Sequence, residues 1–139
     1  MKFVLEENPI PKARHRSHIV CGHVVTYDPQ KSEKMQAKFN IANQMRNAGF
    51  ELIQDGPLDV SIDNFVKIPN SWSQKKKDAL EGSPCISKPD LDNYAKFYFD
   101  VLNGIAYHDD RQITKCRLEK MYSCMPRVEI TINLVNHGN

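Results

Sequence analysis

The sequence lacks the features that mark several common classes of protein. No two of its four cysteines are spaced as Cys-x-x-Cys, so a structural zinc site is not expected. No apolar run is long enough to span a bilayer, and the N-terminus shows no signal-peptide pattern. We therefore expect a cytoplasmic protein with reduced thiols and no membrane partner.

Internal repeats and domain-scale linkers are also absent from the 139 residues. The length is that of one ordinary domain, and a hydrophobic fraction of 40% is enough for a single core. Charged residues make up 26%, which argues against a disordered chain. We expect one domain that covers residues 1–139.

The spacing of apolar residues predicts an alternation of strands and helices. Strands are expected at 1–6, within 19–27 as a strand or hairpin arm, at 58–68, at 113–121 and at 128–135. Helices are expected at 31–47, in a short piece of 69–82, and from Asp90 to about Asn103. This mixed order predicts an α+β fold with one mixed β-sheet and helices packed on it.

Both long helices carry an apolar stripe at helical spacing. The stripe of the first helix consists of Met35, Phe39, Ile41, Ala42 and Met45. The stripe of the last helix consists of Leu91, Tyr94, Ala95, Tyr98, Val101 and Leu102. We expect both stripes to pack in the core.

Acidic residues are missing from residues 8–27, where three of the five histidines also lie. Lys12, Arg14 and Arg16 occupy every second position there, so an extended backbone would place the three cations on one side. The segment is either a solvated loop or a face that binds phosphate groups, for which arginine offers paired donors. The run of Lys75, Lys76 and Lys77 is more typical of a solvated helix face, and its role stays open.

Charge is divided unevenly along the chain, although the formal net charge is only +2. The stretch 88–112 holds five aspartates and three basic residues, whereas the rest of the chain holds sixteen basic and twelve acidic residues. A local acidic cluster in a mildly basic body fits a metal site that faces a polyanion such as nucleic acid.

The five aspartates of this stretch are Asp90, Asp92, Asp100, Asp109 and Asp110. Taken singly, Asp90 is a natural helix N-cap, and Asp109 with Asp110 is an ordinary turn. Taken together, the two close pairs have the chemistry of a Mg²⁺ site, because hard cations bind a few carboxylates and keep positions open for water and phosphate. Asp92 and Lys96 are four residues apart and therefore share one face of the helix.

A site that uses both aspartate pairs requires the chain to turn back. The helix between them is about 18 Å long, so the residues after Gly104 must return along it before Asp110 can approach Asp90 and Asp92. On that condition the residues predict metal-assisted phosphodiester hydrolysis. The cation would activate water and polarise the phosphate, and Lys96 would stabilise charge in the transition state.

Several motifs occur in an order known from one nuclease family. They are Lys88-Pro-Asp-Leu-Asp-Asn93, Lys96, Asp100, Leu102-Asn-Gly104, Asp109-Asp110-x-Gln112 and Pro11-Lys-Ala-Arg14-His-Arg16. Together with the final alternating strand they resemble the RusA family of Holliday-junction resolvases over nearly the whole chain. The resemblance implies a homodimeric, Mg²⁺-dependent endodeoxyribonuclease, with Mn²⁺ as an alternative ion and no small-molecule cofactor. Its implied action is paired nicking of four-way or branched DNA in recombination and repair.

The resemblance also assigns roles to individual residues. Asp90, Asp92 and Asp110 are implied to be catalytic metal-binding carboxylates, Asp109 a further metal ligand, and Lys96 the essential lysine. The residues expected to bind DNA are Lys12, Arg14, Arg16 and Lys88. Asp100 matches the family motif but is not expected to be a ligand.

Two other functions stay open on the sequence. One is a nuclease for flaps or branched replication intermediates, and the other is a non-catalytic module that binds branched DNA. A two-fold dimer is expected for a resolvase, because resolving a junction needs two symmetric cuts. The strand within 19–27 and the exposed part of the first helix are the candidate dimer surfaces.

Overall fold

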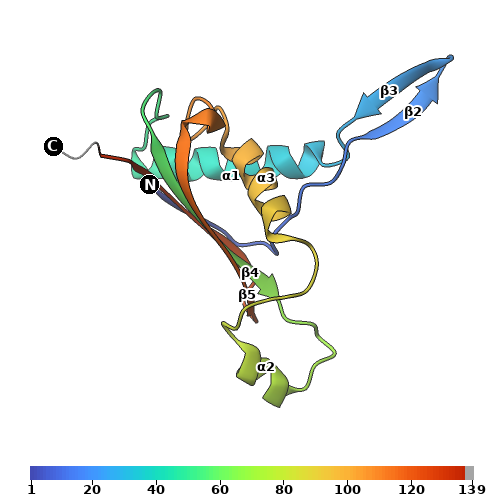
Figure 1. Cartoon of the computed structure of the whole chain (residues 1–139), viewed down its shortest axis with the longest axis vertical. Helices are drawn as coiled ribbons and strands as arrows, with labels where there is room; N and C mark the ends of the chain where they lie inside the picture. Colours follow the sequence, from blue (N-terminus) through green and yellow to red (C-terminus); the bar gives the residue numbers. More distant parts are fainter. Residues whose placement is uncertain (137–139) are drawn as a thin grey trace.

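A twisted four-stranded sheet forms the body of the protein in the computed structural model, which describes residues 1–136 (Figure 1). Its strands lie in the order β1 (Lys2–Leu5), β6 (Arg127–Leu134), β4 (Leu58–Lys67) and β5 (Ile113–Ser123). Strands β4 and β5 are parallel, whereas β1 with β6 and β6 with β4 are antiparallel. The expected α+β fold with a mixed sheet is therefore confirmed.

Two helices cover one face of this sheet, α1 (Lys31–Ala48) and α3 (Leu91–Leu102) (Figure 1). Leu58, Val60 and Ile62 alternate with half-buried polar residues along β4, so every second side chain enters the core. Helix α3 supplies most of the helical side of the core, including Phe97 and Tyr98, both fully buried. The stripe predicted for the last helix is thus confirmed as buried except at Leu91, which is only half-buried.

The stripe predicted for the first helix is partly wrong. Ile41 and Met45 are buried as expected, together with Ala37. Met35 and Phe39, however, are 62% and 68% exposed. The buried side chains recur every four residues from Ala37, and Met35 and Phe39 form a second row on the solvent side of the same helix.

Replacing Ile41 by Ala is expected to lower the free energy of unfolding by about 2–5 kcal/mol, because the residue is fully buried between helix and sheet. Urea unfolding measures this change. Ile86→Ala is the matched control, since Ile86 is 94% exposed and its truncation should change stability by less than about 0.5 kcal/mol. Equal losses in the two variants would contradict the placement of α1.

A hairpin arm projects from the body and does not join the main sheet (Figure 1). It pairs β2 (Arg16–Val20) with β3 (His23–Tyr27) in an antiparallel ladder. Cys21 and Gly22 form the turn, both with positive φ, as a two-residue turn of type I′ requires. The expectation of a single sheet is corrected by this arm, which forms a second sheet of two strands.

Helix α2 (Gln74–Leu80) lies beyond the far end of the main sheet (Figure 1). A small cluster of Ile68, Cys85 and Tyr122 anchors this region, with Trp72 packed against it. The ammonium of Lys76 lies 4.0 Å from the centre of the Trp72 ring. None of the helices in residues 1–136 is long and apolar enough to cross a bilayer.

Candidate active site

The N-terminus of α3 presents the first aspartate pair to solvent. Asp90 is the N-cap residue, with extended dihedral angles, but its carboxylate makes no capping hydrogen bond. Asp92 lies in the first turn, and its carboxylate is 3.4 Å from the Lys96 ammonium, both side chains being largely exposed. The predicted shared face of Asp92 and Lys96 is therefore confirmed, and both carboxylates are available to a ligand.

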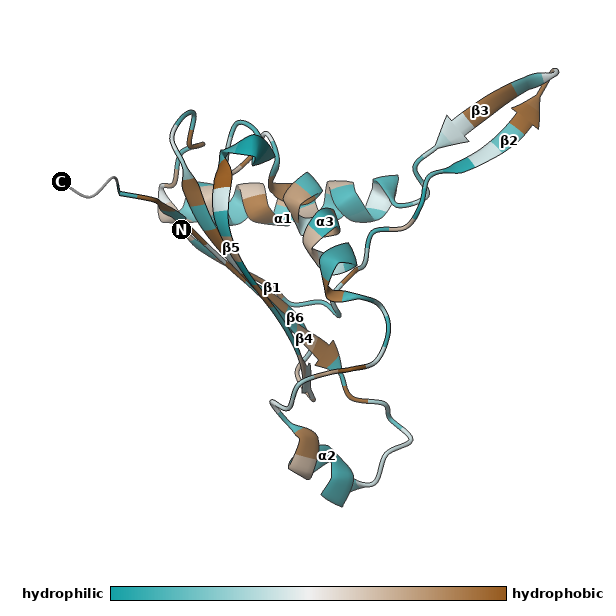
Figure 2. Ribbon diagram, viewed as in Figure 1, coloured by the Kyte–Doolittle hydropathy of each residue, from teal (hydrophilic) through white to brown (hydrophobic). Residues whose placement is uncertain are grey.

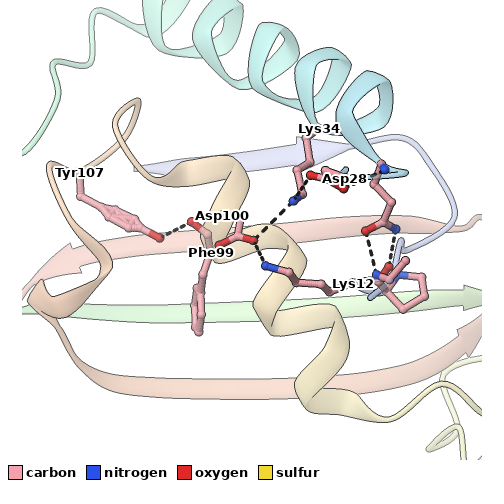
Figure 3. A network of polar contacts seen from close by, with 9 residues as sticks. Lys12, Asp28, Lys34, Phe99, Asp100 and Tyr107 are labelled. Atoms are coloured by element: carbon pink, nitrogen blue, oxygen red, sulfur yellow. Dashed lines mark hydrogen bonds and ion pairs between the residues drawn. The ribbon is translucent and has the colours of Figure 1, made fainter. Parts of the chain in front are cut away.

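Asp100, further along α3, ties three segments together (Figure 3). Its carboxylate forms an ion pair with Lys12 from the N-terminal segment and lies 3.7 Å from the Lys34 ammonium of α1. Lys34 also lies 2.6 Å from Asp28, and this hydrogen bond holds the pKa of Asp28 below its usual range. Asp100 thus has two cationic partners, and Lys12 shares its charge with a carboxylate.

Backbone contacts fix the segment that leads into the arm. The Lys12 N–H donates to the Asn93 carbonyl oxygen at 2.9 Å, which joins this segment to α3. The Ala13 N–H donates to Gln30 Oε1 at 2.8 Å, and Gln30 Nε2 donates to the Pro11 carbonyl oxygen at 2.7 Å. Gln30 is buried and acts as a clamp at the base of the arm.

A basic surface pocket results from these contacts. Its volume is about 490 Å³, and it is lined by Lys12, Ala13, Arg14, His15, Asn93 and Lys96. The sequence placed these groups eighty residues apart, and the fold brings the basic segment to the helix that carries Asp92. Ammonium, guanidinium and amide donors around one hollow are suited to binding a phosphate group.

The other predicted DNA contacts lie near this pocket along the chain but do not line it. Arg16 is exposed at the base of the arm, where β2 begins. Lys88 is exposed in the loop before α3, next to Pro89, with which it forms a cis peptide bond. Lys75 and Lys76 are exposed on α2, well away from the arm (Figure 1).

The second aspartate pair opens the short helix η1 (Asp110–Gln112). Asp109 is its N-cap: its carboxylate accepts the Arg111 N–H at 3.0 Å, and this bond lowers the pKa of Asp109. Gln112 Oε1 in turn accepts the Asp109 N–H at 3.0 Å. The pKa of Asp110 is raised, first by burial and then by the neighbouring carboxyls of Asp109 and Asp100.

The two aspartate pairs lie at opposite ends of α3 within the chain. Asp110 lies near Asp100. The segment just before Asp110 is fixed by a hydrogen bond from the His108 N–H to the Ile53 carbonyl oxygen at 3.1 Å. The expected return along the helix, about 18 Å long, is therefore not made. In the described residues no three His, Cys, Asp or Glu side chains gather as a metal-binding group.

The donor chemistry nonetheless fits Mg²⁺. This ion is usually bound in enzymes of phosphate chemistry by one or two carboxylates, with water and substrate phosphate completing its shell. Asp90 with Asp92, or Asp109 with Asp110, supplies that number. Asp110 also lies where its like-charged neighbours disfavour its ionised form, so a bound cation would relieve repulsion there.

Comparison with known proteins identifies the family. The model of the family described as endodeoxyribonuclease RusA matches residues 6–133, a span that includes both aspartate pairs, Lys96 and the basic segment. The chain belongs to the RusA endodeoxyribonuclease family. Membership supports a Holliday-junction-resolving endodeoxyribonuclease activity.

Two relatives match this RusA-family chain over almost its full length. The uncharacterized protein YqaN of Bacillus subtilis (strain 168) is 34% identical over 141 residues, which cover 98% of this chain and 97% of YqaN. The crossover junction endodeoxyribonuclease rusA of Lactococcus phage r1t is 27% identical over 137 residues, with 96% of each chain covered. The RusA resemblance indicated by the order of the motifs is therefore confirmed.

Proposed function

We propose that this protein is a Mg²⁺-dependent endodeoxyribonuclease that resolves Holliday junctions by paired symmetric nicks in DNA recombination and repair. The observation that carries the proposal is the RusA family match over residues 6–133, which contains every motif of the aspartate stretch. The basic pocket beside Asp92 and Lys96 supports it, because a nuclease must hold a phosphate next to its carboxylates.

The proposed metal ligands are two pairs at opposite ends of α3, Asp90 with Asp92 and Asp109 with Asp110, each of which supplies the one or two carboxylates that Mg²⁺ needs. Bound there, Mg²⁺ or Mn²⁺ would supply an activated water and neutralise charge on the phosphate. The chain's own contribution is to present the carboxylates on fixed backbone: Asp90 and Asp92 at a helix start, and Asp109 and Asp110 in a capped turn. Lys96 is held 3.4 Å from Asp92, so it can contact the phosphate that approaches this carboxylate.

The basic segment would hold the DNA backbone. Arg14 and Lys96 line the pocket, and Arg16 and Lys88 are exposed cations close to its lining residues in the sequence. Lys12 would act mainly through position, because its ammonium is engaged by Asp100 and its N–H by Asn93. A homodimer is part of the proposal, since two symmetric cuts call for two equivalent sites.

The test is nicking of synthetic substrates with and without Mg²⁺. A four-way junction, a flap, a fork and a linear duplex of shared sequence are incubated side by side with the full chain. Symmetric paired nicks in the junction that require the metal would support the proposal. Preferred cutting of the flap or fork would favour a nuclease for replication intermediates, and tight junction binding without any nicking would favour a binding module.

Replacing Arg14 and Arg16 together by Ala is expected to weaken junction binding and flatten its salt dependence. Each phosphate contact releases condensed counterions, so losing two in each subunit of the dimer should reduce the slope of log K against log salt by up to about 3 to 4. Fluorescence anisotropy at several salt concentrations measures the slope. The double variant Lys75→Ala with Lys76→Ala removes the same charge from α2, and an equal change in both variants would remove any special role from the basic segment.

A further inference from the structure

Two groups of apolar side chains lie exposed on neighbouring parts of the chain. On the arm, Ile19 and Val24 face each other across the two strands and are 74% and 71% exposed. On α1, Met35 and Phe39 form the solvent-side row described above. Only residues 28–30 separate β3 from α1, so both groups belong to one region of the molecule.

Beyond its clamped base, the arm is not packed against the rest of residues 1–136. Every residue of β2 and β3 is exposed, and the arm points away from the body (Figure 1). A two-stranded hairpin alone in water is marginally stable, and apolar side chains on both of its faces add to that cost. Val20, Val25 and Tyr27 are exposed on the face opposite Ile19 and Val24.

Charge along the arm favours a protein partner over DNA. The cations Arg14 and Arg16 lie at its base, but residues 17–27 contain no lysine or arginine. Towards its tip the arm is rich in apolar residues, with brown segments on both strands in Figure 2, and its polar side chains there include His18 and His23. A phosphate backbone would be held by cations, whereas this part of the arm matches an apolar surface.

We propose that the arm of one copy packs on the Met35–Phe39 row of α1 in a second copy, and that the second copy returns the same contact. The inference rests on the homodimer of the proposed function and names the surface that makes it. The arm cannot reach the row on its own α1, because it leaves the N-terminal end of that helix and points outward (Figure 1). A two-fold axis between the copies makes the same arm-to-helix contact occur twice in the dimer.

The area available agrees with a stable dimer. Four large apolar side chains can meet in one such contact: Ile19 and Val24 on one face of the arm, and Met35 and Phe39 on α1. If each contributes on the order of 100 Å², one copy buries roughly 400 Å² of apolar surface, close to the apolar share, somewhat over half, of the about 800 Å² per partner of a standard interface. The contact would also cover the arm face that carries Ile19 and Val24.

The experiment measures molar mass by light scattering, without DNA or metal. The native chain is expected at twice its 16.0 kDa mass. An arm variant (Ile19→Lys with Val24→Lys) and a helix variant (Met35→Glu with Phe39→Glu) are each expected at the mass of one chain. The control Met125→Glu alters a residue that is 70% exposed outside both groups, and it should stay dimeric.

Mixing the two variants gives the sharper result. In a mixed dimer, the lysines on the arm of one variant meet the glutamates on α1 of the other variant, and the second arm-to-helix contact has native residues on both sides. A heterodimer is therefore expected, although neither variant self-associates. A monomeric native chain, a dimeric arm variant, or no heterodimer on mixing would each overturn the inference. Circular dichroism checks folding, and the arm variant remains decisive if the helix variant unfolds, because the arm has no part in the core.

The nicking assay separates this inference from the proposed function. Suppose that the native chain cuts the junction in a metal-dependent way and that the arm variant is still a dimer. The proposed function would then stand, and the arm contact would be rejected. An arm variant that stays dimeric but loses junction affinity would show that the arm binds DNA instead.

Discussion

Junction nicking is expected to fall at least about 100-fold when Asp90, Asp92 or Asp110 is replaced singly by Asn, while junction binding persists. The amide keeps the size of the carboxylate but removes the charge that holds a hard cation. None of the three side chains is part of the core, so folding should be unaffected. Single-turnover nicking with Mg²⁺ measures the rate, and gel shifts in Ca²⁺ measure binding.

Binding of Mn²⁺ followed by electron paramagnetic resonance adds a readout that does not depend on cleavage, and it should weaken in the same variants. Asp78→Asn is the matched control, because Asp78 is an exposed aspartate on α2. Any variant of the three that cuts at the native rate would be removed from the metal set. Equal loss of nicking in the control would point to a general effect of charge.

Replacing Lys96 by Ala is expected to lower the nicking rate by about 10²- to 10³-fold with little change in junction affinity. Its ammonium lies beside Asp92 and lines the basic pocket, where charge develops on a phosphate held by the carboxylates. Single-turnover rates and equilibrium binding, measured on the same junction, separate the two effects.

Stability should hardly change in this variant, because exposed ion pairs contribute at most about 1 kcal/mol. Lys96→Arg keeps the charge and serves as the companion variant: partial recovery of nicking would identify the positive charge as the needed property. Equal losses of nicking and binding in Lys96→Ala would instead make Lys96 a DNA contact.

Local patterns predicted the helices and strands well, because the spacing of apolar residues and the capping and turn residues act over only a few positions. The last strand and the helix that starts after Asp90 lie where alternation and capping placed them. The first helix shows the limit of this reasoning. Its apolar residues form two rows, and only packing on the sheet decides that Ile41 faces inward and Phe39 outward.

The sequence identified the individual residues of the candidate site, but it did not predict how the fold arranges them relative to one another. The pairing of Asp92 with Lys96 follows from helical spacing, whereas the ties of Asp100 to Lys12 and Lys34 join segments more than sixty residues apart and left no local signal. The position of Asp110 depends on the path after Gly104. Backbone hydrogen bonds to Ile53 hold that path at the C-terminal end of α3, against the expected return.

The Gln30 clamp has a mechanical consequence. It fastens the strand that enters the arm, while Asp28 accepts the Gln30 N–H at 2.9 Å and so fastens the strand that leaves it. Both strands of the arm are therefore fixed at its base, so the arm is not attached through a flexible hinge. Its root is bonded to Asn93 of α3, so a load applied at the tip would act as torque on the helix that bears Asp92 and Lys96.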